Sequence, residues 1–338
     1  MIEFLPWSKS VLEDSCAALK KGHFPILDIE LGGMCNFRCI YCDSPDRTKL
    51  FSARDYICKL IESENIEWLF ICGLGEPTFA ENKVELLNLL SLCKKNNVKC
   101  SMFTNLISFD EELFSYIESD TLYVMFKLDS FQASIIKKIY GDESLDTNNL
   151  IKKIDRLLSL VKVKDNCTNV CASIVPTTLN CNELIDIVDF CKQHDIFPLL
   201  GDLENSGRGK DVYNKLKLSD AQLSKIKKHL DESYRIPICP SVLCGIHIMH
   251  DGTIAVDAFS GLSCHWFWLE EPSVQELNTV WNYSSYSDIE QAVLSYRTTK
   301  IELVRQKAAT TVPLVFGGCG GDIKELLEMY LVQNDENQ

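Results

Sequence analysis

The sequence has no long apolar run: none of its 338 residues lies in the roughly 18 uninterrupted apolar positions that a membrane-spanning helix needs. It also lacks a secretion signal, because residues 1–15 show no basic segment followed by an apolar one. Positive charge is scarce, with 34 Lys and Arg against 48 Asp and Glu and a net charge of −14. Such a chain has no general attraction for phosphate backbones or anionic lipids. These absences predict a cytoplasmic protein with no membrane partner, and they disfavour nucleic acid as a ligand.

Cysteine, by contrast, is abundant, with 16 residues spread along the chain. Without an export signal we expect these thiols to stay reduced, so they do not indicate a disulfide framework. They are then core residues or metal ligands. The chain is 46% hydrophobic and long for one ordinary domain, which predicts one large domain, alone or with an appendage.

Six apolar runs of strand length alternate with amphipathic segments of helical period. The expected strands cover residues 24–31, 66–73, 98–104, 122–128, 169–176 and 196–203. The expected helices cover residues 52–64, 80–95, 109–118, 146–163, 182–194 and 217–233. Successive strand-then-helix units form parallel strands with right-handed crossovers. Six units are too few for a closed eight-unit barrel. We therefore expect an α/β fold, a partial (β/α)6 TIM-like barrel over residues 1–233. Its site should lie on the loops that follow the strands.

The pattern changes after about residue 234. Residues 234–338 begin with a cysteine-rich segment that carries a DG turn between short β-rich runs and shows no helical period. We therefore expect a small C-terminal domain with a β-hairpin, rather than a seventh strand-and-helix unit.

Three cysteines, Cys35, Cys39 and Cys42, lie within eight positions directly after the first expected strand. One alternative is that they are small buried core residues. A zinc site is another, but structural zinc takes a fourth ligand and usually shows paired CxxC units, which are missing here. A [4Fe–4S] cluster has four iron corners, so three thiolates leave one iron open for chemistry.

This CxxxCxxC arrangement, with the aromatic Tyr41 just before its last cysteine, resembles the signature of the radical S-adenosylmethionine (SAM) superfamily. The resemblance implies that the open iron and Tyr41 belong to a SAM site. It also implies that an electron from the cluster cleaves SAM to methionine and a 5′-deoxyadenosyl radical, which abstracts a substrate hydrogen. The partner implied for this chemistry is a reductase of the flavodoxin or ferredoxin type.

The resemblance extends to later strand ends. The loop with Gly73, Gly75, Glu76 and Pro77 looks like the glycine-rich motif that receives the SAM ammonium. Further cofactor contacts are implied at the ends of the third, fourth and sixth expected strands, although Leu106 stands where the family's motif has glycine. These residues are Asn105, Asp129, Ser130, Glu204 and Arg208. The alternative for each is a turn residue, a helix cap or a solvated side chain.

Four later cysteines, Cys239, Cys244, Cys264 and Cys319, could together complete a closed cluster. This region resembles the SPASM/twitch class, whose cysteine-rich extensions carry auxiliary [4Fe–4S] clusters. Four candidates, with Asp257 where relatives often have cysteine, favour one auxiliary cluster over two, and a zinc site is the alternative. We leave out of the ligand set the nearby His247, His250 and His265, and we assign the other nine cysteines to the core or surface: Cys16, Cys58, Cys72, Cys93, Cys100, Cys167, Cys171, Cys181 and Cys191.

The resemblance leaves the substrate open. We expect oxidative modification, by crosslinking or dehydrogenation, of a ribosomally made peptide. The alternatives are dehydrogenation or epimerisation of a sugar, an aminocyclitol or another small molecule in antibiotic biosynthesis, and epimerisation of a peptide. About 23 residues precede the first expected strand, too few for a separate leader-binding domain. We therefore expect a short-peptide or small-molecule substrate, or leader recognition by another chain.

Overall fold

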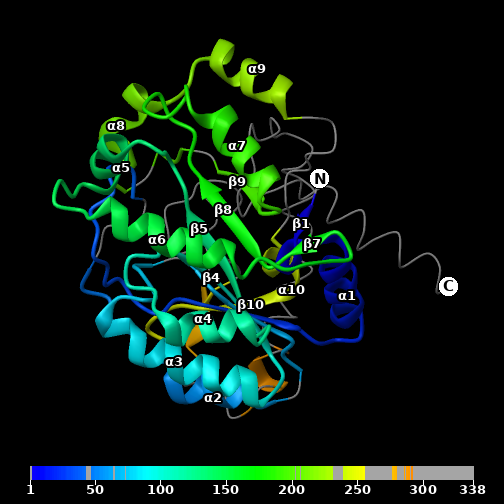
Figure 1. Cartoon of the computed structure of the whole chain (residues 1–338). Coiled ribbons are helices and arrows are strands. Elements are labelled where there is room, and N and C mark those ends of the chain that lie inside the picture. The colour runs from blue at the N-terminus through cyan, green and yellow to red at the C-terminus, as the bar shows by residue number, and fades with distance from the viewer. Residues whose placement is uncertain are drawn as a thin grey trace.

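A computed structural model describes residues 2–42, 47–63, 65–72, 74–201, 203–205, 207–230, 239–255, 276–279, 285, 287–289 and 291. All structural statements below concern these residues. Gly73, Asp257, Cys264, His265 and Cys319 lie outside them, as does most of the expected C-terminal domain. Figure 1 shows the chain, in which the helices lie around a central sheet.

The central sheet has nine strands in the order β12-β11-β10-β2-β3-β4-β5-β8-β9. Its six parallel barrel strands are β2 (Ile26–Ile29), β3 (Trp68–Ile71), β4 (Lys99–Thr104), β5 (Leu122–Lys127), β8 (Val170–Ile174) and β9 (Phe197–Leu200). Each lies within one of the six segments predicted from the sequence. The expected partial barrel of parallel strands is therefore confirmed.

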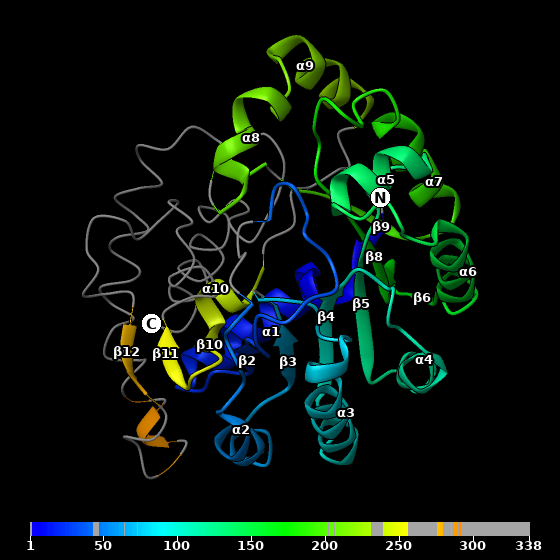
Figure 2. The same ribbon diagram turned by 90° about the vertical axis from the view of Figure 1, so that its left-hand side faces the viewer.

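The helices cover the outside of this sheet, and Figure 2 shows α2, α3, α4, α6 and α7 arranged around its curved strands. The helix bounds are α1 (Lys9–Lys20), α2 (Arg54–Ile61), α3 (Ala80–Lys95), α4 (Glu111–Glu118), α5 (Ala133–Tyr140), α6 (Thr147–Leu158), α7 (Leu184–Gln193), α8 (Gly209–Leu216), α9 (Asp220–His229) and α10 (Ser241–Cys244), and a short 3-10 helix spans Leu5–Trp7. Between the barrel strands, the helices pack their apolar sides on the sheet. On α3, for example, Leu86, Leu89, Leu90 and Cys93 are buried.

Two features of the chain differ from the sequence prediction. The helix expected over 146–163 ends at Leu158, and residues 163–168 form a hairpin of β6 (Val163–Lys164) and β7 (Cys167–Thr168). The turn residues Asp165 and Asn166 both have positive φ, 50° and 60°, which a two-residue hairpin turn of this kind requires. β7 pairs in turn with β1 (Glu3–Phe4). Helices α1, α5 and α8 and the short helix α10 were not expected at all.

The hairpin of β10 (Gly245–Ile248) and β11 (Thr253–Ala255) contains the predicted DG turn. It is not detached from the barrel, because β10 pairs in parallel with β2 over four residues. β11 then pairs with β12 (Glu276–Thr279). The hairpin therefore extends the barrel sheet at the edge formed by the first barrel strand.

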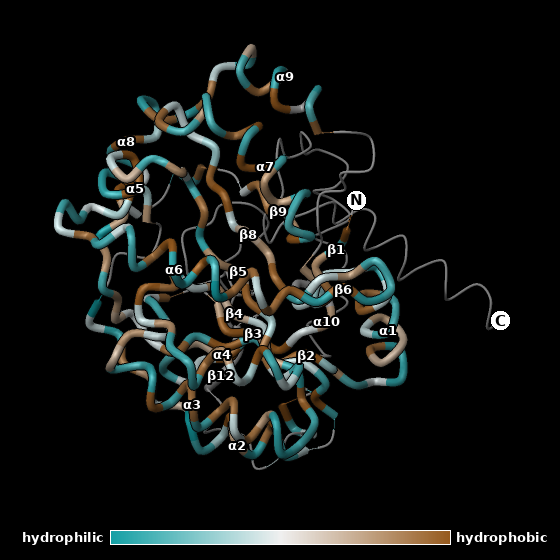
Figure 3. Tube along the Cα trace, in the orientation of Figure 1, coloured by the Kyte–Doolittle hydropathy of each residue, from teal (hydrophilic) through white to brown (hydrophobic). Residues whose placement is uncertain are grey.

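The core lies on both faces of the barrel strands, since β2, β3 and β9 are buried at every position. In Figure 3 the sheet strands are largely hydrophobic and the outer helices alternate between hydrophobic and hydrophilic residues. Within the described residues, no helix has both the length and the apolar content to cross a membrane.

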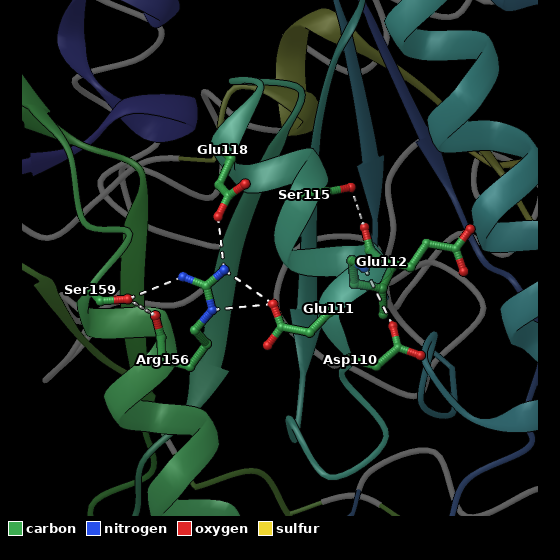
Figure 4. Close-up of polar contacts among 8 residues, drawn as sticks. Asp110, Glu111, Glu112, Ser115, Glu118, Arg156 and Ser159 are labelled. Atoms are coloured by element: carbon green, nitrogen blue, oxygen red, sulfur yellow. Dashed lines mark hydrogen bonds and ion pairs between the residues drawn. The ribbon is translucent and has the colours of Figure 1, made fainter.

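A network of ion pairs joins two outer helices at the periphery (Figure 4). Arg156 on α6 pairs with Glu111 at 3.1 Å and Glu118 at 2.8 Å, both on α4. The two carboxylate side chains are 75% and 50% exposed, so solvent screens the pairs and they contribute little to stability.

Candidate active site

The three cysteines predicted as cluster ligands lie in one loop that leaves the end of β2. Cys35, Cys39 and Cys42 are all half-buried, and the backbone N–H of Phe37 donates a hydrogen bond to the Cys35 sulfur at 3.4 Å. This position, after the first barrel strand, is where the sequence predicts the site. Below, we call residues 32–42 the cysteine loop.

One side of the cysteine loop packs against the end of α5. The N–H groups of Arg38 and Ile40 donate to the carbonyls of Tyr140 and Ile139, at 3.0 and 2.9 Å. Gly141 ends α5 with φ +66°, and a Cβ there would lie 2.5 Å from the Arg38 carbonyl oxygen. Only glycine allows this close approach of the two backbones.

The loop after β3 packs against the start of the cysteine loop. The Glu76 N–H donates to the Met34 carbonyl at 2.8 Å, and the Asn82 side chain donates to the same carbonyl at 3.1 Å. Gly75 has φ +64°, and a Cβ on it would lie 2.3 Å from the Gly32 carbonyl oxygen. The glycine-rich loop predicted to bind SAM is thus in contact with the predicted cluster loop.

The carboxylate of Glu76 is 3% exposed and accepts four hydrogen bonds. Thr78 donates through its hydroxyl at 2.6 Å and its N–H at 3.2 Å, the Thr104 hydroxyl donates at 2.6 Å, and the Asn105 N–H donates at 2.7 Å. Burial raises the pKa of Glu76, while these hydrogen bonds lower it, and the net direction is upward. Glu76 therefore ties the β3 loop to the end of β4.

Asn105 brings the end of β4 to the cysteine loop. Its side-chain amide donates to the side-chain oxygen of Asn36 at 2.8 Å. Asn36 directly follows Cys35 in the cysteine loop. The next residue, Leu106, has φ +65°, a conformation that favours glycine. At the position where the family's motif has glycine, this chain thus has a leucine with left-handed backbone conformation. The Leu106 side chain is fully buried.

Asp129 lies beside the cysteine loop together with a lysine that sequence reasoning missed. Lys127, the last residue of β5, has its Nζ 3.2 Å from Asp129 Oδ2 and 4.5 Å from the ring centroid of Tyr41. Burial raises the pKa of Tyr41 well above its usual value, and the Asp129 carboxylate raises it further. The signal in the sequence was a lysine at the end of an otherwise apolar strand.

Ser130 is engaged with a partner that the sequence did not suggest. Its hydroxyl donates to the carboxylate of Glu183, 3.0 and 2.9 Å from the two oxygens. The N–H of Phe131 and the side chain of Gln132 also donate to Glu183, each at 2.8 Å. In this structure Ser130 therefore belongs to a hydrogen-bonded group that joins the loop after β5 to the start of α7.

The loop after β9 contacts the cysteine loop through Arg208. Its N–H donates to the Cys42 carbonyl at 2.9 Å, and its guanidinium donates to the Cys39 carbonyl at 3.3 Å. Gly209 begins α8, where a Cβ would lie 2.3 Å from the carbonyl oxygen of Glu204, which is half-buried. Arg208 thus contacts the predicted cluster loop itself, rather than only solvent.

Two of the four predicted auxiliary ligands lie in the described part of the chain, and both are buried. The Cys239 sulfur lies 3.1 Å from the Ser241 hydroxyl, and the Cys244 sulfur lies 3.9 Å from that of Cys16 on α1. The sequence had assigned Cys16 to the core or surface. Because Cys264 and Cys319 lie outside the described residues, the four-thiolate set stays a prediction.

A buried polar cluster on β2 and β10 was also missed. Asp28 accepts from the Ser241 hydroxyl at 2.9 Å and the Cys72 thiol at 2.8 Å. Glu30 lies 3.1 Å from the ring nitrogen Nδ1 of His250. His247, 2% exposed, lies between the two carboxylates, 3.6 Å from Asp28 and 4.0 Å from Glu30. The sequence signal was Asp28 in β2 and Glu30 just after it, two acidic residues that alternate with apolar ones in the expected strand over residues 24–31.

The three half-buried thiols of the cysteine loop are a donor set that a [4Fe–4S] cluster accepts. Among the described residues, no three His, Cys, Asp or Glu side chains converge on one ion position. A cubane cluster instead takes each thiolate at a different iron, so its ligands do not have to meet at one point. Burial raises the pKa of Cys35, and that of Cys39 to about 11, so both thiols need a nearby positive charge to ionise. Iron supplies such a charge.

The chain was compared with known proteins at the levels of sequence and structure. No family model and no curated protein matches its sequence. Its structure is similar to that of SuiB from Streptococcus suis bound to S-adenosylmethionine, with 16% identity, a TM-score of 0.59 and coverage of 83% of this chain and 70% of SuiB. It is similar also to SuiB bound to the precursor peptide SuiA, with 16% identity, a TM-score of 0.54 and coverage of 84% and 70%.

A further similar structure is anSMEcpe with bound AdoMet and the Cp18Cys peptide. It shares 15% identity, with a TM-score of 0.53, over 93% of this chain and 98% of that one. At these identities the similarity shows the fold. The chain therefore has the partial-barrel fold of these SAM-binding proteins.

Proposed function

We propose that this protein is a radical SAM enzyme, which binds a [4Fe–4S] cluster through Cys35, Cys39 and Cys42. The loops after β3, β4 and β9 were each predicted from the sequence to contribute to the site. All three contact the loop that bears these three thiols, and this observation carries the proposal. A single cysteine triplet in a turn would not require this. The shared fold with SAM-bound SuiB and anSMEcpe supports it.

The residues have distinct roles in this proposal. When bound, the cluster supplies the electron that cleaves SAM to methionine and the 5′-deoxyadenosyl radical that abstracts a substrate hydrogen. Gly75 lets the SAM-binding loop approach the cysteine loop, and Glu76 receives the SAM ammonium there. The remaining cofactor contacts are assigned to Tyr41, Gly73, Pro77, Asn105, Asp129, Ser130, Glu204 and Arg208.

Cys239, Cys244, Cys264 and Cys319 are assigned to one auxiliary [4Fe–4S] cluster in a SPASM/twitch-type domain over residues 234–338. The burial of Cys239 and Cys244 supports ligation away from solvent. Zinc remains the alternative metal for four thiolates.

The proposed reaction is the oxidative modification, by crosslinking or dehydrogenation, of a ribosomally made peptide in the cytoplasm, with a flavodoxin- or ferredoxin-type reductase as electron donor. The two similar structures with bound peptides support this substrate class. The alternatives are a radical SAM dehydrogenase or epimerase of a small molecule and a peptide epimerase. The product formed in deuterium oxide separates the outcomes, because oxidation removes two mass units, whereas epimerisation through an exchangeable thiol adds one.

The test of the proposed function is reductive SAM cleavage. Anaerobically reconstituted protein should hold about eight irons, four at each of two clusters, and should release 5′-deoxyadenosine when dithionite and SAM are added. Replacing Cys35, Cys39 and Cys42 together with alanine should halve the iron and abolish cleavage. A matched control replaces three half-buried cysteines elsewhere, Cys58, Cys167 and Cys181, and should change neither. Cleavage that persists in the first variant would refute the proposal.

A further inference from the structure

Basic side chains surround the cysteine loop, although the chain as a whole carries a net charge of −14. Arg47 donates to two carbonyl oxygens of the loop, at 3.1 and 2.9 Å, and Arg208 donates to that of Cys39 at 3.3 Å. Lys127 is held in another way, by a carboxylate and aromatic rings. The two arginines therefore hold the backbone of the loop, and the lysine requires another explanation.

The ammonium of Lys127 is fixed beside the loop. It lies 3.2 Å from Asp129 Oδ2, 4.5 Å from the Tyr41 ring centroid and 5.8 Å from that of Tyr140. Tyr41 stands between Cys39 and Cys42 in the sequence. Aromatic faces attract a cation without neutralising it, whereas the Asp129 carboxylate carries a charge of opposite sign.

The side chain is 22% exposed, so water screens this charge less than it screens a surface lysine. Tyr41, whose ring faces the ammonium, lies two residues after Cys39 and directly before Cys42, so the positive charge is fixed next to the part of the loop that bears these two thiols. The field of Lys127 there favours negative charge.

An iron–sulfur cluster on three thiolates is anionic, and its reduction adds one more negative charge. The reduction potentials of such clusters depend on nearby charge, hydrogen bonds and solvent exposure. We propose that Lys127 is a positioning residue that raises the reduction potential of the cluster on Cys35, Cys39 and Cys42, an inference that rests on the proposed function. Lys127 acts by stabilising the reduced cluster more than the oxidised one, and Asp129 opposes it.

The test is a redox titration of the cluster in the absence of SAM. Electron paramagnetic resonance monitors the reduced cluster through the signal that is missing from the variant with Cys35, Cys39 and Cys42 replaced by alanine. In Lys127→Met, the ratio of reduced to oxidised cluster at a fixed potential should fall about tenfold, which is 59 mV for one electron. Lys127→Arg keeps the charge and should stay within about twofold of the unmodified protein. Asp129→Asn should shift the ratio in the opposite direction.

The matched control is Lys162→Met. Lys162 also pairs with an aspartate, Asp120, which precedes β5, whereas Lys127 ends that strand. The Lys162 side chain is 43% exposed, so its removal should leave the ratio unchanged. An unchanged potential in Lys127→Met, or equal shifts in Lys127→Met and Lys162→Met, overturns the inference and leaves the proposed function standing. If Lys127→Met loads no iron, an unchanged or lowered ratio in Asp129→Asn overturns the inference instead. Failure of the unmodified protein to form a cluster on the triplet overturns both.

Discussion

Replacing Gly75 with alanine tests whether the loop after β3 must contact the cysteine loop for a cluster to form. A Cβ at this position would lie 2.3 Å from the Gly32 carbonyl oxygen, 2.5 Å from that of Met34 and 2.8 Å from the Gly33 carbonyl carbon. All three are backbone atoms, so no side-chain rotation can relieve the clash. The chain offers a matched control in Gly22, which has φ +88° but no atom within 4 Å of the added Cβ.

The two substitutions share one cost and differ in another. Placing alanine at positive φ costs about 1–2 kcal/mol at either position. Forcing an extra methyl group into a packed site adds about 1–3 kcal/mol, and this applies only to Gly75. We therefore expect Gly75→Ala to lower the free energy of unfolding by about 2–5 kcal/mol, against about 1–2 kcal/mol for Gly22→Ala.

Anaerobic urea denaturation measures these free energies, and iron analysis with a SAM cleavage assay measures the site. Gly75→Ala should also lose iron from the triplet and release little 5′-deoxyadenosine, because the clash displaces the start of the cysteine loop. Gly22→Ala should retain both. Equal losses of stability in the two variants, or full iron and activity in Gly75→Ala, would show that the contact between the two loops does not matter for the site.

Three further outcomes follow from individual residues. Glu76→Gln should destabilise the protein by about 1–3 kcal/mol even without SAM, because an amide nitrogen then faces a hydrogen-bond donor. Glu85→Gln, at a half-buried glutamate paired with the exposed Arg54, should have a smaller effect, and equal losses of stability in the two variants contradict this. Leu106→Gly relieves about 1–2 kcal/mol of backbone strain but removes a buried side chain worth about 2–5 kcal/mol, so it should lower the free energy of unfolding. A stabilised variant would show that the backbone strain is larger. Arg156→Ala should cause a small loss of stability that shrinks as salt is added, and a salt-independent loss would mean that the pairs in Figure 4 are not screened.

The strands could be predicted because each barrel strand is a short apolar run bounded by turn residues. The missed helices gave weaker signals. α5 and α8 have eight residues each, and α1 precedes the first barrel strand, where no strand-and-helix alternation had begun. The hairpin of β6 and β7 was mistaken for the end of a helix, because its turn depends on two residues, Asp165 and Asn166, in a conformation that composition does not reveal.

The sequence also identified residues at the candidate site but not all of their contacts. For Ser130, predicted at the SAM site, the structure adds a partner that the sequence did not suggest, because its hydroxyl bonds to Glu183, 53 positions away. Lys127 was read only as part of a strand. A lone lysine in an apolar run carries no information about the carboxylate and aromatic ring that will surround it.

By itself the sequence determined the positions of the six barrel strands and the spacing of Cys35, Cys39 and Cys42, because periodicity and ligand spacing are local properties of the chain. Only the tertiary structure decided that Gly75 touches Gly32, that Arg208 donates to Cys39 and that Lys127 lies over Tyr41. These contacts join residues far apart in the chain. They exist because parallel strands bring all their carboxyl ends to one edge of the sheet, where loops from different units meet.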